Sequence, residues 1–197
     1  MIKERHIIII FSLVIVVLFV MLFSSKRDYE ELENQYIKNG ILNPLSNLEQ
    51  TLSSIADFLN EVTTNGHVTL EELNTIKLSA NNALLFLSDF DQNYTDLIID
   101  NGPDFNPTIL YNRIIEVRDN ARILSERGLP NNDGYFILNE KEINSIDTFG
   151  QLMKNYSEYF SNMLELIHEE NLYTSKDFEK SEEWKRHISD IINYISP

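Results

Sequence analysis

The sequence predicts an all-α protein in which an N-terminal transmembrane helix is followed by an antiparallel helical bundle. Three observations predict this fold. First, the seventeen residues from Ile7 to Phe23 include sixteen apolar ones. Second, apolar residues beyond this run recur every three or four positions, as they do along the buried face of a packed helix. Third, we find no convincing run of the alternating apolar and polar residues that is typical of a strand.

Residues 7–25 are the predicted transmembrane anchor. The apolar run alone would form a helix roughly 25 Å long, and Ser24 and Ser25 nearly extend it to the ~30 Å hydrocarbon core. A buried core helix would keep a polar edge, and a cleaved signal peptide would have small residues at −3 and −1. The run has neither feature. We therefore expect an uncleaved anchor whose partner is the lipid bilayer.

The orientation of the anchor is predicted from its flanks. The two flanks carry equal numbers of basic side chains, Lys3 and Arg5 before the run and Lys26 and Arg27 after it. The positive-inside rule is therefore tied, and the charge of the amino terminus favours residues 1–6 as a cytoplasmic tail. Residues 26–42 are then a polar juxtamembrane helix or linker. Residues 43–197 form an acidic extracytoplasmic domain of a single-pass membrane protein, and the many Asn and Ile residues favour a bacterial source.

Four long apolar seams and a shorter fifth one predict the helices of this domain. They run from Leu45 to Val62, Leu73 to Leu97, Leu110 to Leu124, Ile146 to Ile167 and Trp184 to Ile195. The steps of three and four within each seam place its members on one helical face. Two antiparallel helix pairs are expected to form a four-helix bundle, with the fifth helix against one side.

Residues typical of helix ends predict the boundaries of these helices. Asn43-Pro44 and Asn106-Pro107 are expected to open the first and third, because proline suits a first helical turn. Asn39-Gly40 and Arg127-Gly128 are predicted to end helices. Two predicted capping boxes, Thr69-x-x-Glu72 and Asn139-x-x-Glu142, open the second and fourth.

These signals occur twice in the same order, in residues 43–98 and again in residues 106–170. Each unit contains Asn-Pro, an apolar helix, an Asn-Gly or Asp-Gly turn, a capping box and a long helix. Two interpretations are open: duplication of a helical hairpin, or independent use of the same capping chemistry.

The charge and composition exclude several classes of function. The chain has 31 acidic and 16 basic side chains, a net charge of −15, and no cysteine. An acidic surface repels nucleic acid, and without cysteine there is no disulfide, thiolate metal site or cysteine nucleophile. No phosphate-binding glycine loop or serine nucleophile elbow is present. An enzyme is therefore the least favoured class, since no catalytic residue can be nominated.

One segment suggests a calcium site. Glu61, Thr63, Asn65 and Glu72 fall at positions 1, 3, 5 and 12 of a loop that resembles an EF-hand, with Gly66 at position 6. Such a loop uses oxygen ligands at these positions and glycine for its sharp turn. The alternative is a simple Asn-Gly turn followed by the capping box of the next helix.

The sequence predicts a non-catalytic function. We expect an acidic bundle that binds a protein with a basic surface, or a second copy of itself, with Tyr159 as the candidate partner contact because it lies off the main seam. The alternative is an anchored module that senses a ligand or calcium and acts through a partner. No other cofactor and no family resemblance beyond the EF-hand-like loop is predicted.

Overall fold

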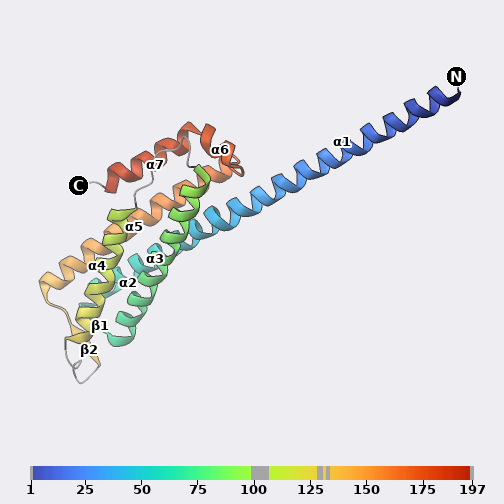
Figure 1. The fold of residues 1–197 in the computed structure, drawn as a ribbon. Coiled ribbons are helices and arrows are strands. Elements are labelled where there is room, and N and C mark those ends of the chain that lie inside the picture. The colour runs from blue at the N-terminus through green and yellow to red at the C-terminus, as the bar shows by residue number, and fades with distance from the viewer. Residues whose placement is uncertain (1, 99–106, 128–130, 132–133, 196–197) are drawn as a thin grey trace.

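The computed structural model is mostly helical, which confirms the all-α prediction (Figure 1). It describes residues 2–98, 107–127, 131 and 134–195, without the side chains of residues 2–14, 96–98, 175 and 191–195. The helices are α1 (Ile2–Ile37), α2 (Asn43–Asn65), α3 (Leu70–Ile98), α4 (Thr108–Glu126), α5 (Glu140–Glu169), α6 (Ser175–Lys180) and α7 (Glu182–Ile195). A π-helix, η1 (Lys38–Leu42), joins α1 to α2, and two short strands, β1 (His67–Thr69) and β2 (Tyr135–Ile137), pair with each other.

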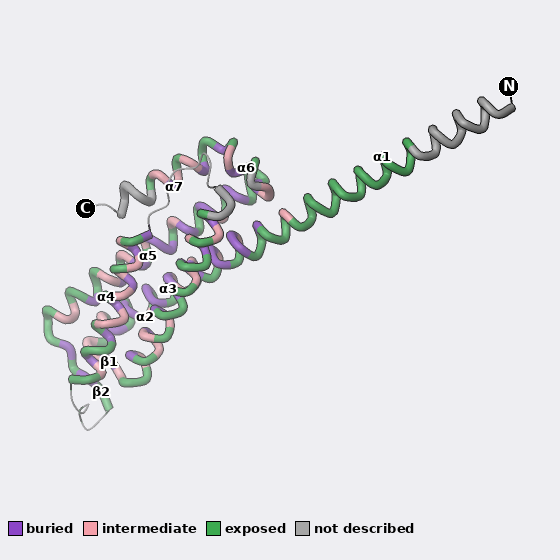
Figure 2. The backbone as a smooth tube through the Cα atoms, viewed as in Figure 1, coloured by how far each residue is buried: buried purple, intermediate pink, exposed green. Residues whose placement is uncertain are grey.

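Helix α1 projects from the bundle, and its side chains become buried only where it reaches α2 and α3 (Figures 1 and 2). Ile37 is the first fully buried residue among the side chains that the structure describes. The side chains from Ile15 to Phe23 are 46–71% exposed and form the described part of the predicted anchor, whereas those of Ile7 to Val14 lie outside the described residues. Within the described part of the chain, no helix has an apolar stretch long enough to cross a membrane.

The predicted helix end at Asn39-Gly40 is wrong, because α1, η1 and α2 follow one another without a break. Asn43 does not cap a new helix either; its backbone is helical and its N–H donates to the carbonyl of Lys38, five residues earlier. The next residue, Pro44, has no N–H to donate, so the ordinary i to i−4 pattern cannot continue through it. The chain instead widens into a π-turn before α2 and remains helical.

Gly40 allows close packing. It is buried in η1, and a Cβ atom at this position would lie 3.0 Å from Cγ of Asn93 on α3. This distance is shorter than nine in ten real Cβ contacts, so a side chain at position 40 requires Asn93 to shift by a few tenths of an ångström. The small residue that suggested a helix end therefore brings the first long helix against α3.

The predicted seams form the core. Every described member of the five seams is buried except Phe149, which is half-buried against the core. Helix α2 packs most extensively against α5 and also against α3, and α3 packs against α4. The void among α2, α3, α4 and α5 measures only about 20 Å³, so the interior is closely packed.

In the described residues, α4 and α5 are not each other's closest neighbours in the bundle. The main neighbour of α4 is α3, and that of α5 is α2. Side chains from α4 and α5, including Leu124 and Phe149, line the interior space between the helices. Leu124 belongs to the buried core, and Phe149 packs against it.

The two strands join the turns of the two hairpins. Val68 of β1 lies opposite Phe136 of β2, and both side chains are buried. In each hairpin a glycine with positive φ precedes the strand, Gly66 at 68° and Gly134 at 84°. These strands have no sequence signal, because three residues are too few to show a periodic pattern.

The two hairpins share more than their turns. Both predicted capping boxes are present, in Thr69–Glu72 and in Asn139–Glu142. The buried positions of α3 also have buried or half-buried counterparts 70 residues later on α5; for example, Phe90 corresponds to Phe160. Both interpretations, duplication of one hairpin and independent use of the same capping chemistry, stay open predictions.

The C-terminal helices cover one end of the bundle. The sequence analysis predicted α7 and missed α6, a six-residue helix opened by a capping box between Thr174 and Asp177. Helix α7 packs against α5, and α6 packs against α3. The aromatic ring of Trp184 on α7 lies 4.8 Å from that of Phe178 on α6 and 6.2 Å from that of Tyr94 on α3, measured between ring centroids.

Candidate functional site

The four predicted calcium ligands lie on two helices and not in an open loop. Glu61, Thr63 and Asn65 are in the last turns of α2, and Glu72 is in the first turn of α3. The Thr63 hydroxyl donates to the carbonyl of Asn60 at 2.8 Å, as helical threonines often do.

The carboxylate of Glu72 takes part in the capping box. Its Oε2 accepts from the Thr69 N–H at 2.6 Å, and the Glu72 N–H donates to the Thr69 hydroxyl at 3.1 Å. The predicted turn and cap are therefore confirmed. Over the described residues, no three His, Asp or Glu side chains are grouped so that they could hold a metal ion. Calcium binding stays a prediction that the structure does not test.

A carboxylate with a lowered pKa joins α4 to α5. Burial alone would raise the pKa of Glu142, but a hydrogen bond from the Asn139 N–H at 2.8 Å and an ion pair with Arg127 together lower it. Arg127 follows the last residue of α4, and Glu142 lies in the first turn of α5. This carboxylate therefore caps α5 and holds the end of α4 beside it.

Replacing Glu142 by glutamine is expected to lower the free energy of unfolding by about 0.5–1 kcal/mol at neutral pH. A carboxyl group whose pKa is lowered by folding stabilises the protein above its unfolded pKa, and this contribution is lost as the pH falls through the folded pKa. The difference between Glu142→Gln and the parent should thus disappear on going from about pH 5 to about pH 3. Denaturant unfolding at several pH values, followed by circular dichroism, measures it.

Glu140→Gln is the matched control for this experiment. It removes the same charge from the same helical turn, but no hydrogen bond or ion pair joins the Glu140 side chain to the described residues. A Glu142→Gln effect that equals the control, or that persists at low pH, would contradict the assigned role.

The candidate partner contact Tyr159 faces the protein's own C-terminal helix. Its hydroxyl donates to the backbone carbonyl of His187 on α7. The rings of Tyr159 and His187 pack edge-on, with their centroids 5.9 Å apart. Tyr159 is half-buried and packs against the core. It links α5 to α7, and its predicted contact with another protein is not tested by this geometry.

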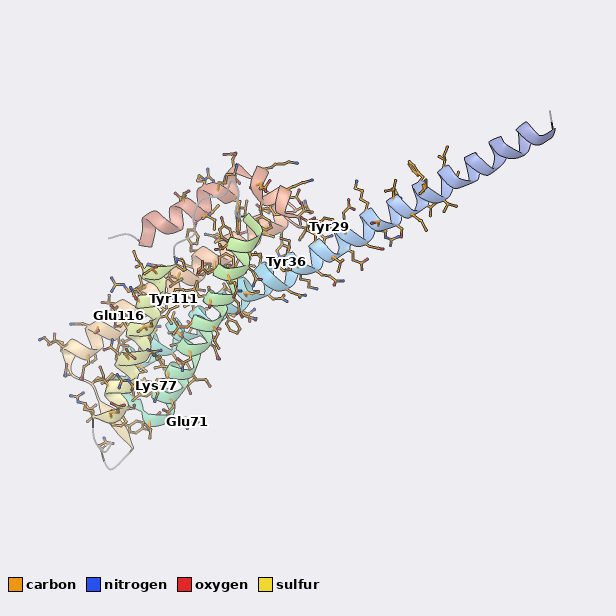
Figure 3. The ribbon with its side chains drawn as sticks, viewed as in Figure 1. Tyr29, Tyr36, Glu71, Lys77, Tyr111 and Glu116 are labelled. Atoms are coloured by element: carbon orange, nitrogen blue, oxygen red, sulfur yellow. The ribbon has the colours of Figure 1, made fainter. Side chains whose placement is uncertain are left out.

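Tyr159→Phe is expected to lower the free energy of unfolding by about 1 kcal/mol, because the hydrogen bond from the Tyr159 hydroxyl to the His187 carbonyl is lost. Thermal unfolding of the full chain followed by circular dichroism measures this loss. Tyr36→Phe is the matched control, since Tyr36 is exposed on α1 and the described residues provide no hydrogen bond for its hydroxyl (Figure 3). Equal stability of the two variants would show that the Tyr159 hydroxyl does not help to hold α7.

A polar cleft lies where α1 joins the bundle, and the sequence analysis missed it. It has a volume of about 590 Å³ and lies between the α1–η1–α2 segment and the end of α5. Its polar lining residues are Asn34, Lys38, Asn43, Ser46, His168 and Tyr173. Leu42 and Leu164 provide its apolar surface. Only the fold could bring these distant positions together.

A second unpredicted feature is the α3 outer face, which we define as Glu71, Leu78, Leu85 and Asp89. Leu78 and Leu85 are each 62% exposed and lie seven residues apart, so they project from the same side of the helix. A shallow hollow of about 500 Å³ lies beside Leu78 and Glu71, and Glu71 marks the start of α3 in Figure 3. Leucines outside the buried seam of α3 were the available sequence signal.

The comparisons with known proteins add no relative. No protein-family model matches the chain, and no curated protein or solved structure matches it.

Proposed function

We propose that this chain is a membrane-anchored protein that presents an acidic helical bundle outside a bacterial cell and binds a protein with a basic surface, without catalysis. The α3 outer face is the observation that carries this proposal. It combines two well-exposed leucines with a carboxylate on either side, Glu71 before them and Asp89 after them. Exposed apolar side chains of this kind are typical of sites that bind other proteins.

Charge supports a basic partner. Beyond residue 23 the chain has 30 acidic and 14 basic side chains. No cation of the described residues forms an ion pair with Glu71 or Asp89. Lysine or arginine side chains around an apolar pocket would match both the leucines and the carboxylates of the α3 outer face.

The apolar run supports the anchor. Sixteen of the seventeen residues from Ile7 to Phe23 are apolar, and the described ones, Ile15 to Phe23, are exposed along α1 and make no contact with the bundle. A continuous apolar surface of this size is unfavourable in water and calls for a covering medium. A lipid bilayer around residues 7–25 would provide it, with the bundle held clear of the membrane by the rest of α1.

Site-specific crosslinking in intact cells tests the binding surface. A photo-crosslinking p-benzoylphenylalanine replaces Leu78 or Leu85, and the control carries it in place of Ile123, which is 57% exposed on α4. We expect one protein to crosslink from positions 78 and 85 and not from position 123. Crosslinked products that contain only this chain would indicate self-association and not binding of a basic partner. Identical products from all three positions would overturn the proposed surface.

Charge variants test the electrostatic part of the proposal. Glu71→Gln with Asp89→Asn should reduce the yield of the crosslink from Leu85, and added salt should reduce it further. Asp57→Asn with Glu61→Gln removes the same charge from exposed positions of α2 and is the matched control. Equal yields from the two double variants would contradict recognition of the partner through Glu71 and Asp89.

A reporter fusion tests the orientation. Alkaline phosphatase fused after residue 197 should be active, because this enzyme needs an oxidising compartment for its disulfides. If a reporter that works only in the cytoplasm were active at this position instead, the extracytoplasmic location would be overturned. Extraction of the full chain from membranes by carbonate alone would overturn the anchor.

A further inference from the structure

We propose that the cleft at the base of α1 binds a small organic anion, namely a carboxylate with an apolar body. This site is separate from the α3 outer face and does not depend on the proposed function. Its walls come from the α1–η1–α2 segment on one side and from α5 and the residues after it on the other. A volume of about 590 Å³ lies within the range of small-molecule sites.

The charge of the cleft differs from that of the whole protein. The chain carries a net charge of −15, yet none of the eight residues that line the cleft is Asp or Glu. One of them, Lys38, is cationic, and its ammonium has no ion-pair partner among the described residues. An unpaired lysine in a cleft without carboxylates favours an anionic ligand.

Hydrogen-bond donors face the same space from several elements. His168 Nδ1 lies 3.3 Å from the Tyr173 hydroxyl, and either group can be the donor of this hydrogen bond. The cleft also contains the amide of Asn34 and the hydroxyl of Ser46, each of which can donate a hydrogen bond. A carboxylate has acceptor oxygens only, so it can accept from these groups and from the Lys38 ammonium.

The apolar surface defines the rest of the ligand. Leu42 of η1 and Leu164 of α5 are half-buried and line the cleft together with the polar groups. Aliphatic side chains beside a cation favour a carboxylate that has a short hydrocarbon or aromatic body over an inorganic anion. A π-helical segment lines the site as well, and such segments are often found at functional sites.

Methyl NMR of the full chain in a non-ionic detergent tests this proposal, with benzoate as the probe. Benzoate should shift the methyl signals of Leu42 and Leu164 with saturation, while those of Leu78 and Leu85 stay in place. Benzamide has the same shape without the charge and should bind about tenfold more weakly, as expected for loss of a charge-assisted hydrogen bond.

Two lysine variants complete the test. Lys38→Gln should weaken benzoate binding by about tenfold. Lys141→Gln is the matched control, because Lys141 is exposed at the start of α5, outside the cleft, and has no ion-pair partner within the described residues. The affinity of Lys141→Gln for benzoate should equal that of the parent. Circular dichroism should show both variants folded, as expected for exposed positions.

Three results would overturn the proposal. The first is the absence of saturable shifts at Leu42 and Leu164 up to roughly 50 mM benzoate. The second is equal binding of benzoate and benzamide, which would exclude recognition of the charge. The third is unchanged binding in Lys38→Gln.

Discussion

Trp184→Ala is expected to lower the free energy of unfolding by about 3–5 kcal/mol, the range for loss of a large buried aromatic side chain. Trp184 is fully buried, although it belongs to a short helix near the C-terminal end of the described residues. Its ring contacts those of Phe178 and Tyr94, so one side chain joins α7 to α6 and α3. An alanine would leave a cavity among three helices, and each would lose part of its packing.

The start of α7 depends on the same residue. The Trp184 N–H donates to the Ser181 hydroxyl at 3.0 Å, and that hydroxyl in turn donates to the Glu170 carboxylate at the end of α5. This chain of hydrogen bonds fixes the backbone that carries the indole. Alanine keeps this backbone N–H and removes only the ring contacts with Phe178 and Tyr94, so we expect α7 to lose its packing and become sensitive to protease in the native protein.

Trp184→Phe is the matched variant. The indole Nε1 is buried and has no hydrogen-bond partner among the described residues. An unpaired buried donor is unfavourable, so its removal offsets part of the packing lost with the smaller ring. We expect this variant to stay within about 1.5 kcal/mol of the parent. Urea unfolding of the full chain in a non-ionic detergent, followed by circular dichroism, measures the free energy of unfolding of both variants. Parent-like stability of Trp184→Ala would show that α7 does not belong to the cooperative core.

The helices and their buried faces were predictable because they depend on local chemistry. Steps of three and four place apolar residues on one side of a helix whatever the tertiary structure, and the seam from Leu45 to Val62 is buried throughout. The capping boxes at Thr69 and Asn139 were predictable for the same reason, since each hydrogen bond joins residues three positions apart.

Features that depend on distant residues were not predictable from one sequence. Gly40 was interpreted as a helix end because its contact, Asn93, lies on another helix. Ser157 lies in the buried face of α5 and donates to Glu49 of α2 at 3.3 Å, a pairing that periodicity cannot reveal. The strand pairing of Val68 with Phe136 likewise requires the two hairpins to be side by side.

The candidate sites also differ in whether they depend on local spacing or on residues that are distant in the chain. Spacing alone suggested ligands from Glu61 to Glu72, and the structure shows that Thr63 and Glu72 are held in helix and cap hydrogen bonds. The cleft at the base of α1 was missed because Lys38 and His168 are 130 positions apart in the chain. Neither residue has a local pattern that distinguishes it from an ordinary surface side chain.

Gly40→Val is expected to lower the free energy of unfolding by about 1–3 kcal/mol, the usual cost of overpacking a closely packed site. The first carbon of any side chain at position 40 would meet three atoms of Asn93 at 3.0–3.2 Å. Valine adds two branches beyond that carbon, and its χ1 angle is restricted in a helix. Either α1 and α2 must move away from α3, or Asn93 must give up its hydrogen bond to the Asp89 carbonyl.

Two further variants separate this contact from helix propensity. Gly40→Ala adds only the first carbon, and the gain of about 1 kcal/mol in helix propensity offsets the displacement of Asn93, so its stability should be close to that of the parent. Asn93→Ala removes the side-chain atoms nearest to position 40 and should restore most of the stability lost in Gly40→Val. The test is a double-mutant cycle measured by urea unfolding, with a coupling energy of about 1 kcal/mol or more expected between the two positions. Additive effects would mean that Gly40 does not set the distance between α1–α2 and α3.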